Sequence, residues 1–265
     1  MNPKMNLSLC HVTTLQLLIY TCIVSMLSVH VVGLQQAASM STSSTTSTTS
    51  NKNYYNYFAF GSNMASSTMT ALRNLEPVAS TAAVLPDHRL AFNVPGTPLV
   101  EPSWASIEPK PSNGPDDSVG TCRNVHGVLY KLTEQDFEAV CNTEGIPFGY
   151  TLHRCRVIPY KGNGDTAGEE ALQSHLDGIN DESGRRVPPS IFAFTLRASR
   201  EEWRKAEDTP PSRAYLNVLI RGSEEYQLDQ QYVEFLKDIV PGKTMFGNGV
   251  AQMMLEAAER RSSFR

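Results

Sequence analysis

The chain has 265 residues, of which 40% are hydrophobic, so it is long enough to form one large domain or two small ones with a buried core. Its 23 basic and 27 acidic side chains give a formal net charge of -4, and the absence of a long basic run argues against a nucleic-acid partner. Five dispersed cysteines without a C-x-x-C pair argue against a complete disulfide framework and against a cysteine-built zinc site.

The first 53 residues differ in composition from the rest of the chain, because they contain lysine but no acidic residue and no arginine. Residues 1–34 are predicted to be a hydrophobic signal or anchor segment. Its apolar run, Leu15–Leu34, is long for a signal peptide and close to the ~20 residues that cross a bilayer. A cleaved targeting sequence and a membrane tether therefore both stay open, and we expect the chain in the secretory pathway, in an organelle or at a membrane. Residues 35–53 are predicted to be a disordered Ser/Thr-rich linker.

A folded domain is predicted over residues 54–241, followed by a C-terminal tail over 242–265. Strand-like runs are expected at residues 54–60, 80–85, 89–94, 127–132, 152–159 and 191–196. Helices are expected after Asn63 and at about 134–141, 199–206, 212–222 and 226–239. The connections 95–123 and 161–189 are read as solvated loops, or else as a lid. More short strands than helices favour an α+β fold, with a small barrel flanked by helices, over a doubly wound sheet.

The first strand-like run meets a turn in the stretch YYNYFAFGSNMASSTM, which starts at Tyr54. Gly61 permits a tight exit from the strand, and Ser62 and Asn63 are good N-cap residues for a following helix. Backbone N–H groups that converge at such a junction would attract a carboxylate. The alternative is an ordinary glycine turn before a capped helix. A role for Ser62 as a nucleophile is weakly supported, because no G-x-S-x-G motif surrounds it.

This turn is one of several segments that resemble the γ-glutamylcyclotransferase family. The sequence YFAFGSNM, starting at Tyr57, resembles the family's opening motif Y-F-A-Y-G-S-N followed by an aliphatic residue, with Phe60 in place of the usual tyrosine. The segments VHGVLYKLTEQDFEAVCNTEGIPFGY and PPSRAYLNVLIRGSEEYQLDQQYVEFLKDI are similar to later family segments and keep their order. The resemblance covers about Tyr55 to Ile239.

The resemblance implies a small closed mixed β-barrel flanked by helices, and an enzyme that converts γ-glutamyl amino acids or peptides into 5-oxoproline and the free amino acid. The expected partner is a small γ-glutamyl substrate, with no metal and no other cofactor, and the sequence indicates no oligomeric state. A related cyclotransferase acting on glutathione or on γ-glutamylamines, and a non-catalytic γ-glutamyl-binding protein of the same fold, are the alternatives.

The resemblance also implies the site residues. Glu144 matches the family's catalytic glutamate, which would take a proton from the substrate's α-amine and give one to the departing amine. Its neighbours in the sequence predict an apolar setting. The positions that match the family's substrate-binding residues are Tyr57, Phe58, Ala59, Phe60, Gly61, Ser62 and Tyr215. Phe60 lacks the phenolic hydroxyl of the usual tyrosine, so one polar contact to the substrate would be missing.

Overall fold

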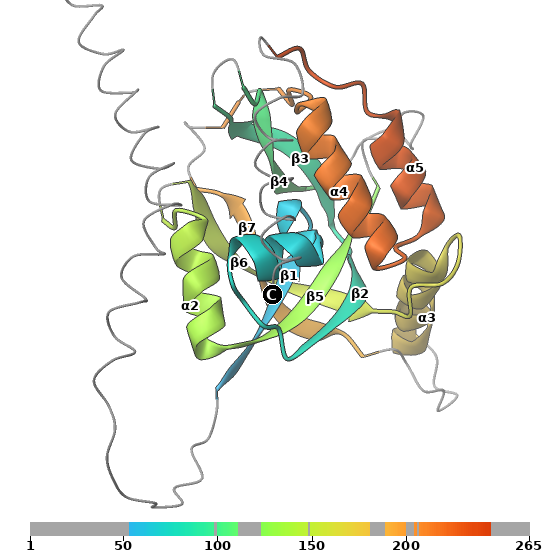
Figure 1. The fold of residues 1–265 in the computed structure, drawn as a ribbon. Coiled ribbons are helices and arrows are strands. Elements are labelled where there is room, and N and C mark those ends of the chain that lie inside the picture. The colour runs from blue at the N-terminus through green and yellow to red at the C-terminus, as the bar shows by residue number, and fades with distance from the viewer. Residues whose placement is uncertain are drawn as a thin grey trace, which may run out of the picture. The chain divides into compact units, whose positions relative to one another are not determined.

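A computed structural model describes residues 53–97, 100–110, 123–147, 149–180, 189–199, 204–205 and 207–244 (Figure 1). The predictions for the hydrophobic segment, for nearly all of the linker and for the tail beyond residue 244 lie outside these ranges. Within them, no helix combines the length and the apolar character needed to cross a membrane. The regular elements run from Tyr54 to Asp238, inside the predicted domain of residues 54–241, whose exact bounds stay a prediction.

The centre of the fold is a closed five-stranded barrel in the order β1-β5-β2-β6-β7. Its strands are β1 (Tyr54–Ala59), β5 (Val125–Thr133), β2 (Ala79–Leu85), β6 (Tyr150–Pro159) and β7 (Ile191–Ala198). Neighbouring strands pair antiparallel except β1 and β7, which close the barrel in parallel. The predicted small closed mixed barrel is therefore confirmed.

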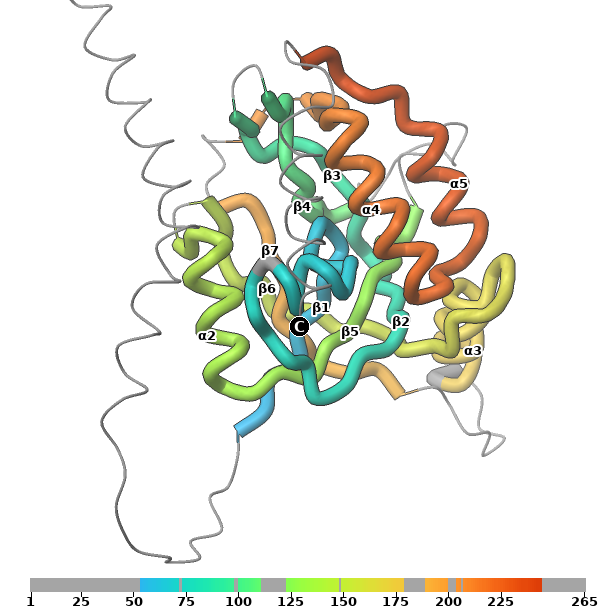
Figure 2. The backbone as a smooth tube through the Cα atoms, viewed as in Figure 1, coloured from blue at the N-terminus to red at the C-terminus, as the bar shows by residue number. Residues whose placement is uncertain are grey.

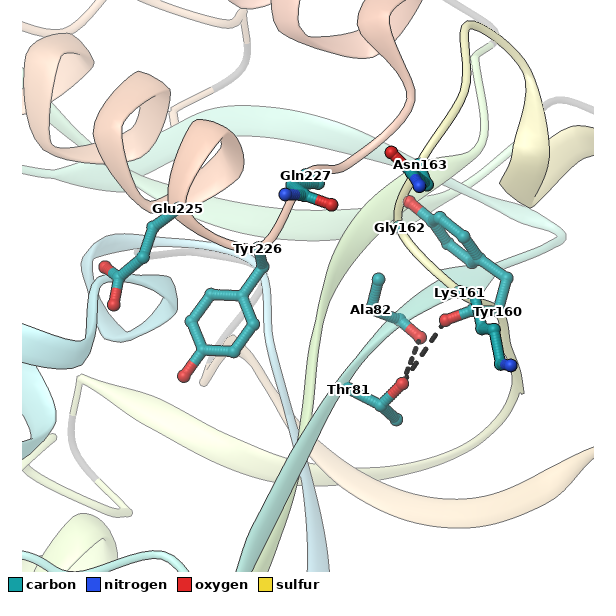
Figure 3. Close-up of a pocket in the computed structure, with 9 residues that line it drawn as sticks. All are labelled: Thr81, Ala82, Tyr160, Lys161, Gly162, Asn163, Glu225, Tyr226 and Gln227. Carbon is teal, nitrogen blue, oxygen red and sulfur yellow. Dashed lines mark hydrogen bonds between the residues drawn. The ribbon is translucent and has the colours of Figure 1, made fainter.

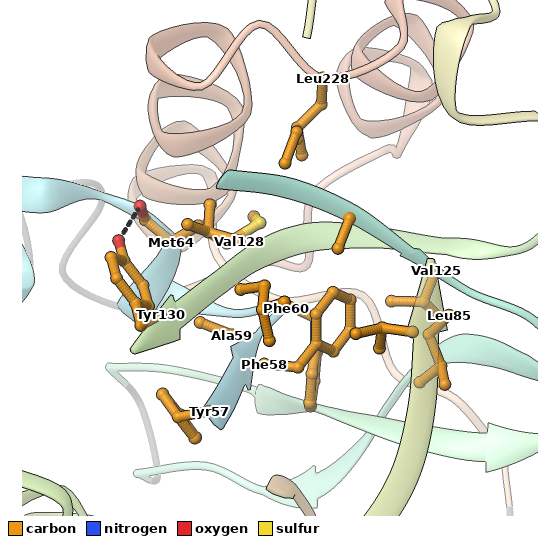
Figure 4. Close-up of a cluster of buried hydrophobic side chains, with 14 of the residues drawn as sticks. Tyr57, Phe58, Ala59, Phe60, Met64, Leu85, Val125, Val128, Tyr130 and Leu228 are labelled. Atoms are coloured by element: carbon orange, nitrogen blue, oxygen red, sulfur yellow. Dashed lines mark hydrogen bonds between the residues drawn. The ribbon is translucent and has the colours of Figure 1, made fainter. Parts of the chain in front are cut away.

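The core is formed by buried aromatic and aliphatic side chains of β1 and β5 together with others such as Met64, Leu85 and Leu228 (Figure 4). Gly127 of β5 allows the two strands to pack closely, because a Cβ atom there would lie 2.2 Å from the carbonyl oxygen of Ala59 and 2.9 Å from the ring of Phe58. Tyr130, also on β5, donates a hydrogen bond of 2.9 Å to the carbonyl of Met64. This bond ties the segment that follows β1 to the barrel.

Two regular elements lie where loops were predicted. β4 (Ser103–Pro109) pairs with β3 (His88–Pro95) in a separate two-stranded sheet, and α3 (Ala167–Asn180) follows β6. The loop predictions for 95–123 and 161–189 were therefore wrong in these parts. The sequence of β4 has a loop-like pattern because prolines lie beside it and polar residues lie within it. In α3 two backbone N–H groups of the first turn donate to the carboxylate of Asp229, a distant residue that a local sequence pattern cannot show.

The remaining helices largely confirm the predictions. α2 (Glu134–Thr143) begins at the expected cap, where the Asp136 N–H donates to Thr133 Oγ1 at 3.2 Å. α4 (Arg213–Glu225) and α5 (Gln230–Asp238) pack against each other, as Figures 1 and 2 show. The helix predicted over 199–206 falls mostly on residues outside the described ranges, and those described there are not helical.

The helix expected after Asn63 is not a regular α-helix. A short 3-10 turn, η1 (Ser62–Met64), is followed by a single widened π-type turn, η2 (Thr68–Leu72). Gly61 occupies the cap position of η1, and no side chain caps that turn. The predicted capping role of Ser62 and Asn63 is therefore wrong, as is the helix dipole expected at this junction, because a turn this short has no appreciable dipole. The amide of Asn63 is instead free to bind other side chains.

Candidate active site

The predicted substrate-binding stretch starts inside β1 and ends in η1. The side chains of Tyr57, Phe58, Ala59 and Phe60 are all buried in the core. Phe58 also accepts a hydrogen bond from Thr195 Oγ1 through its carbonyl oxygen, at 2.8 Å. The side chains of Phe58 and Ala59 therefore pack in the core on opposite faces of β1, because successive side chains of a strand alternate. The turn at Gly61 and Ser62 lies just beyond them, where the chain leaves the barrel.

Tyr215 lies against this turn although it comes from α4, far along the sequence. A Cβ atom on Gly61 would lie 3.1 Å from the Tyr215 hydroxyl oxygen, so the glycine lets the hydroxyl approach the backbone. The N–H of Ala105 on β4 donates to the same oxygen at 3.4 Å, and the ring of Trp104 packs edge-on at 5.0 Å. Burial raises the pKa of the Tyr215 hydroxyl, so it stays a neutral hydrogen-bonding group.

Tyr215 is held by the N-terminus of α4. The Tyr215 N–H donates to Ser212 Oγ at 3.1 Å, which caps the helix. Ser212 is in turn fixed by Glu101, whose carboxylate accepts bonds from the Ser212 N–H at 2.8 Å and from its hydroxyl. Glu101 is only 2% exposed, and burial raises the pKa of its carboxyl group. This buried acid lies behind the candidate site and supports it.

Glu144 follows the last residue of α2, and its carboxylate lies beside the turn that follows β1. Oε1 accepts a hydrogen bond from Asn63 Nδ2 at 2.9 Å and forms an ion pair with Arg73. The side chains of Glu144 and Arg73 are each only 13% exposed. The apolar setting expected from the neighbouring sequence is therefore wrong, because η1 and the residue after η2 bring an amide and a guanidinium to the carboxylate.

Asn63 connects Glu144 to the barrel. Its Nδ2 also donates to the Tyr57 hydroxyl at 2.8 Å, while its Oδ1 accepts from Arg73 Nε at 3.0 Å. The Tyr57 oxygen is the acceptor in this bond, so its own hydrogen is left for another acceptor. Burial, with a smaller contribution from the nearby Glu144, raises the pKa of Tyr57 and keeps it a neutral donor.

Sequence reasoning missed two members of this cluster. Asn63 was inside the motif that carried the resemblance but was assigned a capping role. Arg73 belongs to no motif, and its contact with Glu144 depends on the path of the chain through η2, so no sequence signal pointed to it. Within the described ranges, no group of histidine, cysteine, aspartate and glutamate side chains could hold a metal ion.

A hollow of about 460 Å³ lies elsewhere on the domain, between β2, the residues after β6 and the end of α4 (Figure 3). Its lining includes Thr81, Tyr160, Lys161 and Tyr226. None of the lining residues is Glu144, Tyr57 or Tyr215, so this hollow is distinct from the predicted site.

Comparison with known proteins gives relatives for most of the domain, although no family model matches the chain. The chain is 32% identical to the γ-glutamyl cyclotransferase gliK of Claviceps purpurea over 169 residues, which are 64% of this chain and 63% of that protein. It is 29% identical to the γ-glutamyl cyclotransferase verK of Clonostachys rogersoniana, over 60% of this chain and 79% of the relative. The match thus spans slightly less than two thirds of the first relative's length.

Solved structures give the same fold. A structure of a γ-glutamyl cyclotransferase aligns with a TM-score of 0.51 at 19% identity, covering 77% of this chain and 99% of that one. An uncharacterized protein from Homo sapiens aligns with a TM-score of 0.51 at 20% identity, covering 77% of this chain and 98% of that one. At such low identity these likenesses concern the fold alone.

Proposed function

We propose that this chain, which is related to the γ-glutamyl cyclotransferases and has their fold, is itself a γ-glutamylcyclotransferase. The reaction converts a γ-glutamyl amino acid or peptide into 5-oxoproline and the free amino acid. The observation that carries the proposal is the contact of Glu144 with Asn63, because it joins a largely buried carboxylate to the turn that resembles the family's substrate-binding motif.

In the proposed mechanism, the α-amine nitrogen of the substrate attacks the carbonyl carbon of its own γ-amide. The new C–N bond closes a five-membered lactam, and the bond from that carbon to the departing amine breaks. Glu144 takes the proton that the α-amine loses and gives a proton to the departing amine, so no water is consumed and the carboxylate returns to its starting state. The reacting atoms belong to one molecule, so the protein has to fold the substrate and move protons.

The turn after β1 would hold the rest of the glutamyl group. We assign the backbone around Phe60, Gly61 and Ser62 to the substrate's polar groups, together with the hydroxyl groups of Tyr57 and Tyr215. The position of these two tyrosines supports the assignment. Tyr57 and Glu144 both accept a hydrogen bond from Asn63 Nδ2, and the Tyr215 hydroxyl lies against Gly61. Phe58 and Ala59 would contribute through packing. Phe60 lacks a hydroxyl group, so the substrate would have one polar partner fewer at that position.

The proposed function is tested by 5-oxoproline release from a panel of γ-glutamyl compounds by the full chain. We expect turnover of γ-glutamyl-alanine. Higher turnover of glutathione or of γ-glutamyl-ε-lysine would indicate the related cyclotransferases instead. Binding of these compounds in a calorimeter without any product by chromatography would contradict an enzyme and favour a γ-glutamyl-binding protein.

Tyr215→Phe is expected to raise KM about fivefold for a γ-glutamyl substrate and to change kcat little. The substitution keeps the ring in its place beside Trp104 and removes one hydrogen bond to the bound substrate, which is worth about 1 kcal/mol. Steady-state kinetics with γ-glutamyl-alanine measures both constants. Tyr226→Phe is a matched control, because Tyr226 follows α4 and lines the separate hollow. Equal effects of the two substitutions would argue against a substrate contact at Tyr215.

A second proposal concerns location. The composition of Leu15–Leu34 supports targeting to the secretory pathway or to an organelle, or else a membrane tether. Mass spectrometry of the N-terminus of the protein made in its native cell would show whether the segment is removed. An intact N-terminus in protein that washes off membranes with salt would contradict both forms of the proposal.

A further inference from the structure

We propose that Arg73 is a positioning residue for Glu144, and that it selects which of the two carboxylate oxygens exchanges protons with the substrate. Arg73 and Asn63 hold Oε1, so Oε2 is the oxygen that takes the proton from the α-amine and returns it to the departing amine. The inference rests on the proposed cyclotransferase activity and adds to it a residue and an atom.

The guanidinium of Arg73 is fixed at three nitrogens. Nε donates to Asn63 Oδ1 at 3.0 Å, Nη1 donates to Thr143 Oγ1, and Nη2 donates to Glu144 Oε1. Thr143 ends α2 and directly precedes Glu144, while Asn63 lies in the turn after β1. A planar group with a rigid set of donors therefore locks the end of α2 to the substrate-binding turn.

The two carboxylate oxygens of Glu144 differ in the hydrogen bonds that they accept. Both hydrogen bonds that the carboxylate accepts from the described residues, those from Asn63 Nδ2 and Arg73 Nη2, end at Oε1. An oxygen that already accepts two bonds, one of them from a cation, is a poorer proton acceptor than its partner on the same carboxylate. Oε2 thus remains as the proton-exchanging atom, and rotation of the carboxylate is restrained.

The backbone presents Arg73 through an unusual turn. Its N–H donates to the carbonyl of Thr68 at 3.2 Å, which closes the widened turn η2, and Asn74 then takes a left-handed conformation with φ of 53°. Buried Met69 and Leu75 hold the turn in the core, and they are also joined by a backbone hydrogen bond of 3.0 Å. Such π-type turns are rare and often lie at functional sites. The turn here fixes where the guanidinium can reach.

Arg73 also sets the charge around Glu144. It is the basic side chain that contacts this carboxylate among the residues the structure describes. The other titratable groups that face it are Tyr57, Cys141, Tyr150 and Tyr215. Burial raises the pKa of each of these four, so they carry no charge at neutral pH. Removal of the guanidinium would therefore leave the Glu144 carboxylate with no compensating cation among these groups.

The test compares Arg73→Gln, Arg73→Lys and the control Arg221→Gln in the full chain, with γ-glutamyl-alanine as substrate. Arg221 donates to Ser67, just before η2, so the control removes a charge beside the same segment without touching Glu144. Arg73→Gln is expected to lower kcat about 100-fold with little change in KM. Arg73→Lys should recover part of the lost kcat, and Arg221→Gln should stay within about twofold of the parent.

A second set of variants keeps the inference testable if Arg73→Gln folds poorly. Thr143→Val removes one partner of the guanidinium and should lower kcat in the same direction by a smaller factor. Arg73→Lys added to Glu144→Gln should lower the residual rate no further, because the two residues act through one carboxylate.

Two results would overturn the inference. The first is an Arg73→Gln protein with the parent's kcat. The second is a raised KM with unchanged kcat, which would mean that Arg73 binds the substrate directly. If the unmodified chain forms no 5-oxoproline from any compound of the panel, the proposed function itself fails, and this outcome is distinct from both of these.

Discussion

Glu144→Gln is expected to lower the rate of 5-oxoproline release about 1,000-fold. Glutamine has nearly the same shape and can still accept hydrogen bonds from Asn63 and Arg73 through its amide oxygen, so the site should keep its geometry. It cannot, however, take the proton from the substrate's α-amine. Substrate affinity should change little, because the proposed contacts of the glutamyl group lie on other residues. Single-turnover kinetics and calorimetry measure the rate and the affinity separately.

The matched control for this substitution is Glu138→Gln. Glu138 is an exposed residue of α2, the helix that directly precedes Glu144. Its substitution therefore makes the same change of charge nearby without altering the cluster around Asn63. The control should keep the parent rate within about twofold. A Glu144→Gln protein as active as the parent would contradict the assignment of Glu144.

Glu101→Ala is expected to lower the free energy of unfolding by about 3 kcal/mol. The substitution leaves the buried N–H and hydroxyl of Ser212 without their acceptor, and Ser212 caps the helix that carries Tyr215. KM should rise as well, since Tyr215 loses its support. Urea unfolding measures the first effect. Glu76→Ala, at an exposed position, is the control and should change stability by no more than about 0.5 kcal/mol.

The pH dependence at Glu101 has a definite sign. Burial raises the pKa of this carboxyl group in the folded chain, so the folded state favours the protonated form. The contribution of Glu101 to stability is therefore greatest below its unfolded pKa of about 4.3 and falls as the pH rises through the higher folded value. Glu101→Gln keeps hydrogen-bonding groups and does not titrate, so its stability relative to the parent should increase with pH across this window. A difference that stays constant or decreases would contradict a raised pKa at Glu101.

The barrel strands could be predicted from the sequence because each is a short, largely apolar segment that contains β-branched or aromatic residues, and the closed barrel was implied by the resemblance. β4 could not, because prolines flank a short segment with polar residues, and its strand conformation depends on pairing with β3. α3 was missed for a similar reason. The stretch KGNGDT directly before it has the composition of a loop, and its first turn is fixed by the distant Asp229. Contacts between segments far apart in the sequence decided both elements.

Part of the candidate site could likewise be predicted from the sequence, and part of it could not. Glu144 and Tyr215 were found through the resemblance, and the structure brings both to the turn at Gly61 and Asn63. Arg73 was not found, since only the widened turn η2 directs it back to the end of α2. A carboxylate expected in an apolar setting has a guanidinium partner as a result.

The central claim is that the chain closes a lactam and does not hydrolyse its substrate. Product analysis after reaction with γ-glutamyl-alanine in water enriched in ¹⁸O tests this most directly. Intramolecular attack by the α-amine predicts 5-oxoproline and alanine in equal amounts, with no ¹⁸O in either product. Formation of glutamate that carries ¹⁸O would show that water attacks the γ-carbonyl, and would contradict the cyclisation.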